Sequence, residues 1–196
     1  MPMEPKILLN KGNETINLTM RVLFAYSPNY LDTYNSYELL LNDNNNLCAL
    51  ASAIFSNNST NYNVQVMNIL TAEQDDFEVV NSCIAHNVIA MHNLLERYVN
   101  GEFNIIKVLQ EIFQANVVVL QAQLCTEPVI DVTGIAYSIG FNNPAEACIG
   151  IYRSILIYDT PTALVYPTIL NHEIGHLLGC VHPLPLNENP NPAFVP

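Results

Sequence analysis

The sequence predicts an α/β protein with a mainly parallel sheet, and three observations support this prediction. Segments with strand-like and helix-like patterns alternate along the chain, as expected of strand-helix-strand units. The segment VVVL at 117–120 is an unbroken apolar run, which is typical of a strand covered on both faces. The chain has 196 residues, of which 50% are hydrophobic, enough for one sizeable core. We therefore expect a single α/β domain.

The first part of the chain predicts a strand, a helix and a second strand. TMRVLFAYS, from Thr19, is rich in β-branched and aromatic residues and is bounded by Pro28, so we expect a strand. Apolar residues then recur at helical spacing over 34–56, which predicts one helix. The Asn-rich run 41–46 inside it is expected to be a surface loop or a weak point. The segment 61–70 alternates with period two and predicts the second strand.

The rest of the chain predicts two helices, a third strand, two short β segments and a last helix. The helices are expected within 77–114 with a break near Asn100, and the remaining elements at 115–123, 132–140, 147–153 and from near Pro167 onwards. Each return from one strand to the next through helices is a crossover, and crossovers join parallel strands. The later β pair, separated by an Asn-Pro turn, then adds to one side of the sheet.

Charge composition disfavours two classes of partner. The chain has 18 acidic and 6 Lys and Arg residues, for a net charge of -12. Nucleic acids and anionic membrane surfaces attract basic patches, so we expect neither as a partner. No stretch approaches the roughly 18 unbroken apolar residues of a membrane span, and the first residues show no signal-peptide core. Composition leaves the oligomeric state and the compartment open.

Five cysteines are too few for a disulfide scaffold, and their odd number leaves at least one thiol unpaired within a single chain. Cys125 and Cys148 bracket a strand-rich stretch and could form a disulfide. The alternative is that both are buried as small hydrophobic residues. The sequence leaves both interpretations open.

One short segment concentrates the ionisable chemistry of the chain. HEIGHLLGCVH, residues 172–182, contains three of the five histidines. On a helix, His172 and His176 lie four residues apart on one face and can reach one ion. A continued helix would carry His182 to the wrong face, about 240 degrees further round, so the chain must reverse. Gly179 supplies this hinge, because glycine ends helices in the left-handed conformation.

Three histidines and one glutamate in this arrangement predict a catalytic zinc site. Three neutral imidazoles, those of His172, His176 and His182, leave the fourth tetrahedral position of Zn²⁺ open for water. Zinc acidifies this water, and Glu173 lies beside the ligands as the general base that takes its proton. The expected reaction is metal-assisted hydrolysis, most naturally of a peptide bond. We interpret His86 and His92, on an apolar helical segment, as structural residues, and expect no second metal.

The motif HEIGHLLGCVH matches the H-E-x-x-H-x-x-G-x-x-H signature of the metzincin zinc endopeptidases, and the chain resembles their reprolysin (adamalysin-like) branch. RVLFAYSPNY, FQANVVVLQAQ and TGIAYSIG also resemble strands of that family. This resemblance implies a twisted five-stranded mixed sheet, four strands parallel and one antiparallel at the edge, with the active-site helix beneath. It implies an N-terminal extension (1–18), a catalytic domain (19–182) and a Pro/Asn-rich tail (183–196). It further implies a secreted protein.

The family also implies where a substrate would bind. Its antiparallel edge strand pairs with an extended protein or peptide substrate, which is strand addition in physical terms. Carried over to this chain, that role falls on Gly134, Ile135, Ala136 and Tyr137. An ordinary edge strand without a substrate role is the alternative.

Three departures from the family pattern keep other hypotheses open. Pro183 stands where reprolysins usually have Asp, every methionine lies upstream of the motif although the family has a methionine turn after it, and Cys180 lies inside the motif. Cys180 is a competing ligand, a disulfide partner or an apolar filler. We therefore expect either a short or missing C-terminal subdomain or another residue in place of the methionine turn. The alternative to a working endopeptidase is a catalytically impaired remnant or a zinc-containing binding module of the same fold. A metallopeptidase of another clan is a third hypothesis.

Overall fold

The structure is a computed structural model that describes residues 16–32, 34–56, 62–74, 87–124, 134–140, 143–154 and 168–182. Its strands are β1 (Ile16–Tyr26), β2 (Tyr62–Glu73), β3 (Val117–Leu124), β4 (Gly134–Ala136) and β5 (Cys148–Ser154). Its helices are α1 (Pro28–Asp32), α2 (Tyr37–Ser56), α3 (Asn87–Val99), α4 (Asn104–Phe113) and α5 (Ile169–Leu177), with a 3-10 helix, η1 (Pro144–Glu146), before β5. The predicted α/β class is therefore confirmed.

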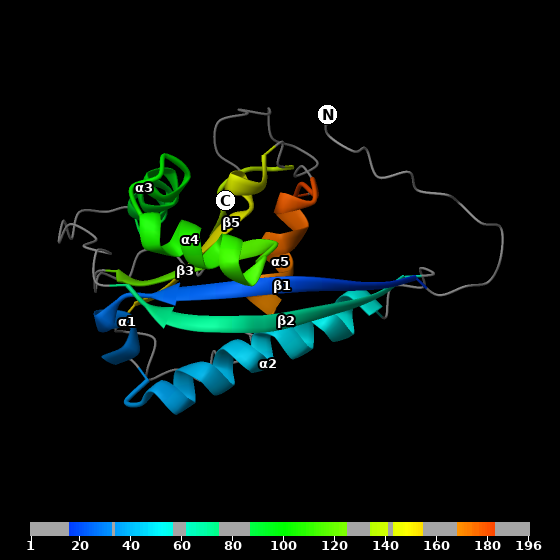
Figure 1. Cartoon of the computed structure of the whole chain (residues 1–196), viewed down its shortest axis with the longest axis horizontal. Helices are drawn as coiled ribbons and strands as arrows, with labels where there is room; N and C mark the ends of the chain where they lie inside the picture. The colour runs from blue at the N-terminus through cyan, green and yellow to red at the C-terminus, as the bar shows by residue number, and fades with distance from the viewer. Residues whose placement is uncertain are drawn as a thin grey trace, which may run out of the picture.

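The five strands form one mixed sheet in the order β2-β1-β3-β5-β4. Strand β1 pairs in parallel with β2 and β3, and β3 pairs in parallel with β5. Strand β4 pairs antiparallel with β5 and ends the sheet (Figure 1). The expected sheet of four parallel strands and one antiparallel edge strand is thus the sheet that the chain forms.

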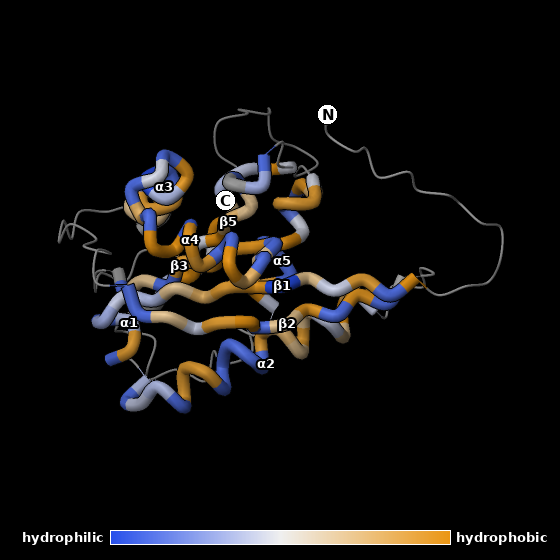
Figure 2. Tube along the Cα trace, viewed as in Figure 1, coloured by the Kyte–Doolittle hydropathy of each residue, from blue (hydrophilic) through white to orange (hydrophobic). Residues whose placement is uncertain are grey.

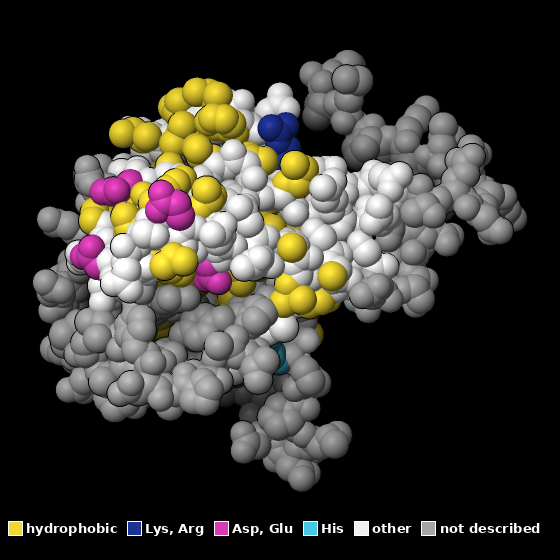
Figure 3. All heavy atoms as spheres, turned by 90° about the horizontal axis from the view of Figure 1, so that it is seen from below, with side chains coloured by type: hydrophobic (Ala, Val, Ile, Leu, Met, Phe, Trp, Pro, Cys, Tyr) yellow, Lys and Arg dark blue, Asp and Glu magenta, His cyan; other side chains and the backbone are white. Residues whose placement is uncertain are grey.

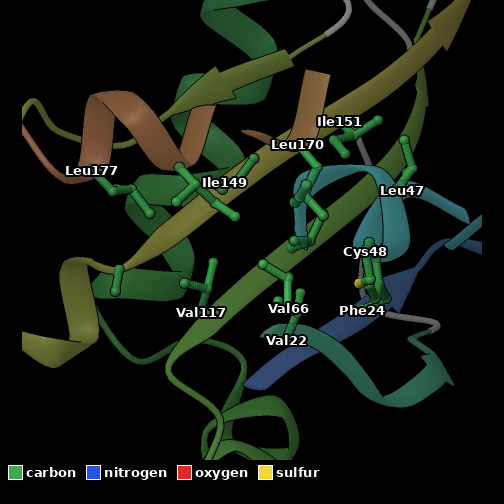
Figure 4. Close-up of a cluster of buried hydrophobic side chains, with 14 residues drawn as sticks. Val22, Phe24, Leu47, Cys48, Val66, Val117, Ile149, Ile151, Leu170 and Leu177 are labelled. Carbon is green, nitrogen blue, oxygen red and sulfur yellow. The ribbon is translucent and has the colours of Figure 1, made fainter. Parts of the chain in front are cut away.

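Alternate residues of the central strands enter two separate cores, one on each face of the sheet. On β3, Val117 and Val119 pack toward α2 and α5, whereas Val118 and Leu120 pack toward α3 and α4. Figure 4 shows the first core, in which Leu170 and Leu177 of α5 meet strand residues. Figure 2 shows the matching hydrophobic colour along the sheet. The unbroken apolar run of β3 is explained by this coverage on both faces.

Several element boundaries differ from the sequence expectation. Strand β1 begins at Ile16, so residues 16–18, which we expected in an N-terminal extension, belong to the sheet. Strand β4 covers only Gly134–Ala136 of the expected 132–140. Helix α1 follows Ser27, whose carbonyl accepts from the Tyr30 N–H at 2.9 Å, and was not expected. Residues 132–133 and 141–142, within or next to the predicted segments, lie outside the described part of the chain.

The Asn-rich run does not break α2, because it contains a buried polar contact. Asn44 is fully buried and exchanges two hydrogen bonds with the Gln121 amide of β3, at 2.8 and 3.2 Å. Its side chain also donates to the Thr71 hydroxyl of β2 at 3.3 Å. A buried amide that finds partners stabilises its helix in place of interrupting it. The network ties α2 to two strands.

Helix α2 also covers the edge strand β2. The Ser52 hydroxyl accepts from the Val66 N–H at 2.7 Å, and the Ser56 hydroxyl donates to the Val64 carbonyl at 3.3 Å. The Tyr37 hydroxyl donates to the Thr71 carbonyl at 3.1 Å. Unpaired edges attract foreign strands, and covering them is a common protection. This edge of the sheet is therefore closed by side chains of the chain itself.

The surface agrees with the acidic composition. Figure 3 shows acidic side chains scattered among hydrophobic ones, with little basic surface on that face. None of the helices among the described residues combines the length and the apolarity needed to cross a bilayer. Cys48 and Cys148 are free and buried, and Cys180 is free and exposed. The pairing considered for Cys148 involves Cys125, which lies outside the described residues.

Candidate metal centre

Helix α5 carries its buried apolar residues on one face and its histidines on another. Leu170, Ile174 and Leu177 recur at i, i+4 and i+7 and are fully buried in the core shared with α2. This stripe fixes the rotation of the helix. His172 and His176 then lie together on a neighbouring face, His172 exposed and His176 half-buried. The apolar spacing around the histidines is therefore what directs them outward.

The helix ends as the sequence predicts, in a left-handed turn at Gly179. Its φ is +94°, the Gly179 N–H donates to the His176 carbonyl at 2.8 Å, and the Cys180 N–H donates to the Gly175 carbonyl at 2.9 Å. This pair of hydrogen bonds is the Schellman motif. The reversal returns the chain toward α5 within three residues of Gly179 and places His182 beside the helix.

The three imidazoles converge. The Nε2 atom of His176 lies 3.1 Å from Nε2 of His172 and 3.0 Å from Nε2 of His182. The ring centroids are 4.7 to 4.9 Å apart in all three pairs. Two nitrogens bound to one tetrahedral zinc lie about 3.4 Å apart, so the three histidines fit a common metal ion. Among the described residues, no fourth His, Cys, Asp or Glu joins this group.

A backbone carbonyl selects the tautomer of the middle histidine. The Nδ1 atom of His176 lies 2.8 Å from the Cys180 carbonyl oxygen. A carbonyl only accepts, so Nδ1 carries the proton and Nε2 of the neutral ring keeps its lone pair for a metal. Burial, followed by the neighbouring His176 and His182, lowers the pKa of His172. The neutral form of the His172 imidazole is therefore favoured, and the neutral imidazole is the form that binds metals.

Glu173 is held between α5 and β4. Its side chain is 4% exposed, and the Ala136 backbone N–H donates a hydrogen bond to its carboxylate. Burial raises the pKa of Glu173 to about 7, and the hydrogen bond from Ala136 opposes this rise. A carboxyl group with such a pKa can accept and release a proton near neutrality.

The four residues expected along the substrate strand divide between the two faces of the sheet. Gly134 packs against α5 so closely that an added Cβ would lie 2.6 Å from Ile169 and 3.1 Å from Glu173 Cγ. Ala136 also packs on the α5 side, whereas Ile135 and Tyr137 pack on the α3 side. Tyr137 follows β4 and stacks on His92 of α3, with ring centroids 5.7 Å apart. The structure therefore brings Gly134 and Ala136 to Glu173 and helix α5, and directs the side chains of Ile135 and Tyr137 toward the α3 side.

Two contacts at the site could not be predicted from the sequence. The Ala136 N–H bond to Glu173 involves a main-chain group, for which no residue pattern exists. The contact between His92 and Tyr137 joins residues that are 45 positions apart, and helical spacing alone identified His92 only as one residue of an apolar helix. His86 lies outside the described residues.

No protein-family model and no curated protein matches the chain. Solved structures do match, among them a chaperone-substrate complex with 14% sequence identity and a TM-score of 0.58. The match covers 87% of this chain and 25% of that chain. The chain thus spans about a quarter of the length of the protein that it matches, and the likeness shows the fold alone.

Proposed function

We propose that the chain is a zinc-dependent endopeptidase of the metzincin type, with its closest likeness to the reprolysin branch. The observation that carries the proposal is the convergence of three imidazoles beside a buried glutamate: Nε2 of His176 lies 3.1 Å from Nε2 of His172 and 3.0 Å from Nε2 of His182, and Glu173 is 4% exposed. His172, His176 and His182 would hold the ion. A purely structural site has no need of Glu173, and a set of three histidines would leave a fourth position for water, as is typical of catalytic zinc.

The roles of the other residues follow from their places. Zinc, when bound, supplies Lewis-acid chemistry that polarises a peptide carbonyl and acidifies water. Glu173 takes a proton from the attacking water and delivers it to the leaving nitrogen. The Ala136 N–H orients the carboxylate, and burial against β4 keeps bulk water away from it. The Cys180 carbonyl holds the His176 ring in the required orientation.

We assign an extended peptide substrate to strand β4, because β4 is the sheet edge that packs against the histidine helix α5. The opposite edge, β2, is covered by hydroxyls of α2. At β4 the Tyr137 N–H donates inward to the Cys148 carbonyl at 3.0 Å. The alternation of a strand then turns the Ala136 backbone outward, toward α5. Strand addition along this edge would align an extended peptide with little sequence preference.

The test combines metal analysis with a protease assay on the full chain. We expect about one zinc per chain and chelator-sensitive cleavage of an unfolded protein such as casein. The Glu173→Ala variant should retain zinc and lose at least about 99% of the activity, because general-base catalysis contributes roughly 100-fold or more. The matched control is Glu111→Ala, an exposed glutamate on α4, which should leave the activity unchanged.

Full activity in Glu173→Ala with intact zinc would refute the assignment of the general base. Absence of zinc from the wild type and from the protein after zinc addition would refute the metal centre. One zinc per chain without cleavage of any unfolded substrate would favour the second candidate, a catalytically impaired remnant or binding module. The observation that favours this second candidate is Pro183, which follows the third histidine where the family that the chain resembles usually has Asp.

A further inference from the structure

Residues 134–140, which we call the β4 segment, are bonded to two residues of the histidine helix. The Ala136 N–H donates to the Glu173 carboxylate, and the Gly140 N–H donates to the His176 carbonyl at 2.9 Å. Gly134 lies in close contact with Ile169 and Glu173. The position of the β4 segment therefore controls the hydrogen bond that orients the proposed general base.

The opposite side of the β4 segment is held by α3. The His92 ring stacks on the Tyr137 ring with an interplanar angle of 24° and centroids 5.7 Å apart. His92 is exposed, whereas its helix neighbours Met91 and Leu95 are fully buried in the core on that face. These buried neighbours fix the helix, so the imidazole stands at a defined place against Tyr137.

The backbone ladder that joins the segment to the sheet is short. Strand β4 has only three residues, and its register with β5 runs from Gly134 opposite Ile151 to Ala136 opposite Ile149. Tyr137 adds one backbone hydrogen bond, to the Cys148 carbonyl. A strand this short is weakly fixed by its ladder alone, so side-chain contacts at its end have a large share in its order.

We propose that His92 is a positioning residue for the candidate active site: by stacking on Tyr137 it holds the β4 segment where the Ala136 N–H meets Glu173. The effect on catalysis rests on the proposed function, whereas the effect on the order of the segment does not. His92 touches neither the substrate nor the metal. It acts from the α3 layer, across the sheet edge, on a carboxylate of the α5 layer.

Hydrogen-deuterium exchange of the full chain tests the physical part of the inference. In His92→Ala, amides of the β4 segment should exchange about three- to tenfold faster than in the wild type, since an aromatic stack of ordinary strength is lost. His92→Phe keeps a ring at this position and should restore slow exchange. Asn93→Ala, a neighbouring exposed position on α3, is the matched control and should exchange like the wild type.

Amides of β3 report on the whole fold in the same experiment. If β3 and the β4 segment speed up equally in His92→Ala, the role of His92 is general stability and the inference is overturned. Unchanged exchange in His92→Ala, or exchange in His92→Phe as fast as in His92→Ala, would overturn it as well.

The catalytic part is read from kinetics with zinc content measured in parallel. We expect kcat/KM for a peptide to fall about three- to tenfold in His92→Ala, mainly through kcat, with zinc per chain unchanged and with recovery in His92→Phe. A rise in KM alone, without a change in kcat, would contradict the positioning role. If the wild type cleaves nothing, the proposed function fails and the exchange experiment still decides the role of His92 in ordering the segment.

Discussion

At the scale of single residues, the candidate site depends on one backbone conformation. Gly179 has a φ of +94°, and a Cβ at this position would meet no atom within 4 Å. A side chain there is therefore disfavoured by conformation and not by space. The turn also sets the Cys180 carbonyl that holds His176 and brings His182 back to the helix. The orientation of the His176 ring and the position of His182 thus depend on one left-handed residue.

Gly179→Ala tests this dependence. The left-handed conformation costs roughly 1–2 kcal/mol for a residue with a Cβ, so we expect zinc affinity to fall about tenfold as the turn relaxes. Gly179→Asn is the matched variant, because asparagine adopts this conformation more readily, and it should lose less affinity than the alanine variant. Titration with a zinc chelator of known affinity measures both. Equal, wild-type affinity in the two variants would contradict the role of the turn.

At the scale of elements, α2 is held by a polar contact inside an apolar layer. Asn44 and Gln121 are both fully buried, and they satisfy each other through two hydrogen bonds. The cost of removing one partner is the cost of leaving the other amide unpaired. The contact also specifies the register of α2 on the sheet, and this register places Ser52 and Ser56 along β2.

Asn44→Ala should lower the free energy of unfolding by about 1–3 kcal/mol, because the Gln121 amide stays buried without its partner. Asn46→Ala lies two residues away on the exposed side of the same helix and should change it by less than about 0.5 kcal/mol. Urea unfolding followed by circular dichroism gives both values. Equal effects from the two variants would show that the buried pair has no special weight.

At the scale of the whole molecule, buried protonated groups make the fold sensitive to alkali. Burial raises the pKa of the Cys48 thiol from 9.0 to about 12, and raises the pKa of the Cys148 thiol further. Burial, with the nearby Glu73 carboxylate, also raises the pKa of Tyr26 from 10.0 to about 12. In each case the unfolded chain loses its proton at a lower pH than the folded chain does.

This difference predicts the direction of the pH dependence. The buried, protonated Cys48 thiol stabilises the folded state fully below pH 9.0, which is the pKa of this thiol in the unfolded chain. This stabilisation is lost as the pH rises toward 12, the pKa of the thiol in the folded chain. Each such thiol lowers the free energy of unfolding by up to about 1.4 kcal/mol per pH unit in that range. We expect the urea midpoint of the reduced, chelator-treated protein to fall steadily above pH 9, and to fall less steeply in Cys48→Ala. A constant midpoint from pH 8 to pH 11 would contradict this.

Local pattern was enough to predict the class of fold, the order of the strands along the chain, and the three histidines that meet. Apolar periodicity reports on which face of an element is buried, and the offsets in HEIGHLLGCVH report on a helix followed by a reversal at Gly179. These properties arise from neighbours within one or two turns of the chain. For this reason the expected convergence of His172, His176 and His182 agrees with the structure.

Contacts between distant segments could be established only by the tertiary structure. Continuity of α2 through its asparagines depends on Gln121, which lies 77 positions from Asn44. The bond that orients Glu173 comes from a backbone amide of β4, and the ring against Tyr137 comes from α3. Hydrogen bonds and ring contacts of this kind act over a few ångströms, and which groups come that close depends on how the layers pack and not on the order of residues along the chain.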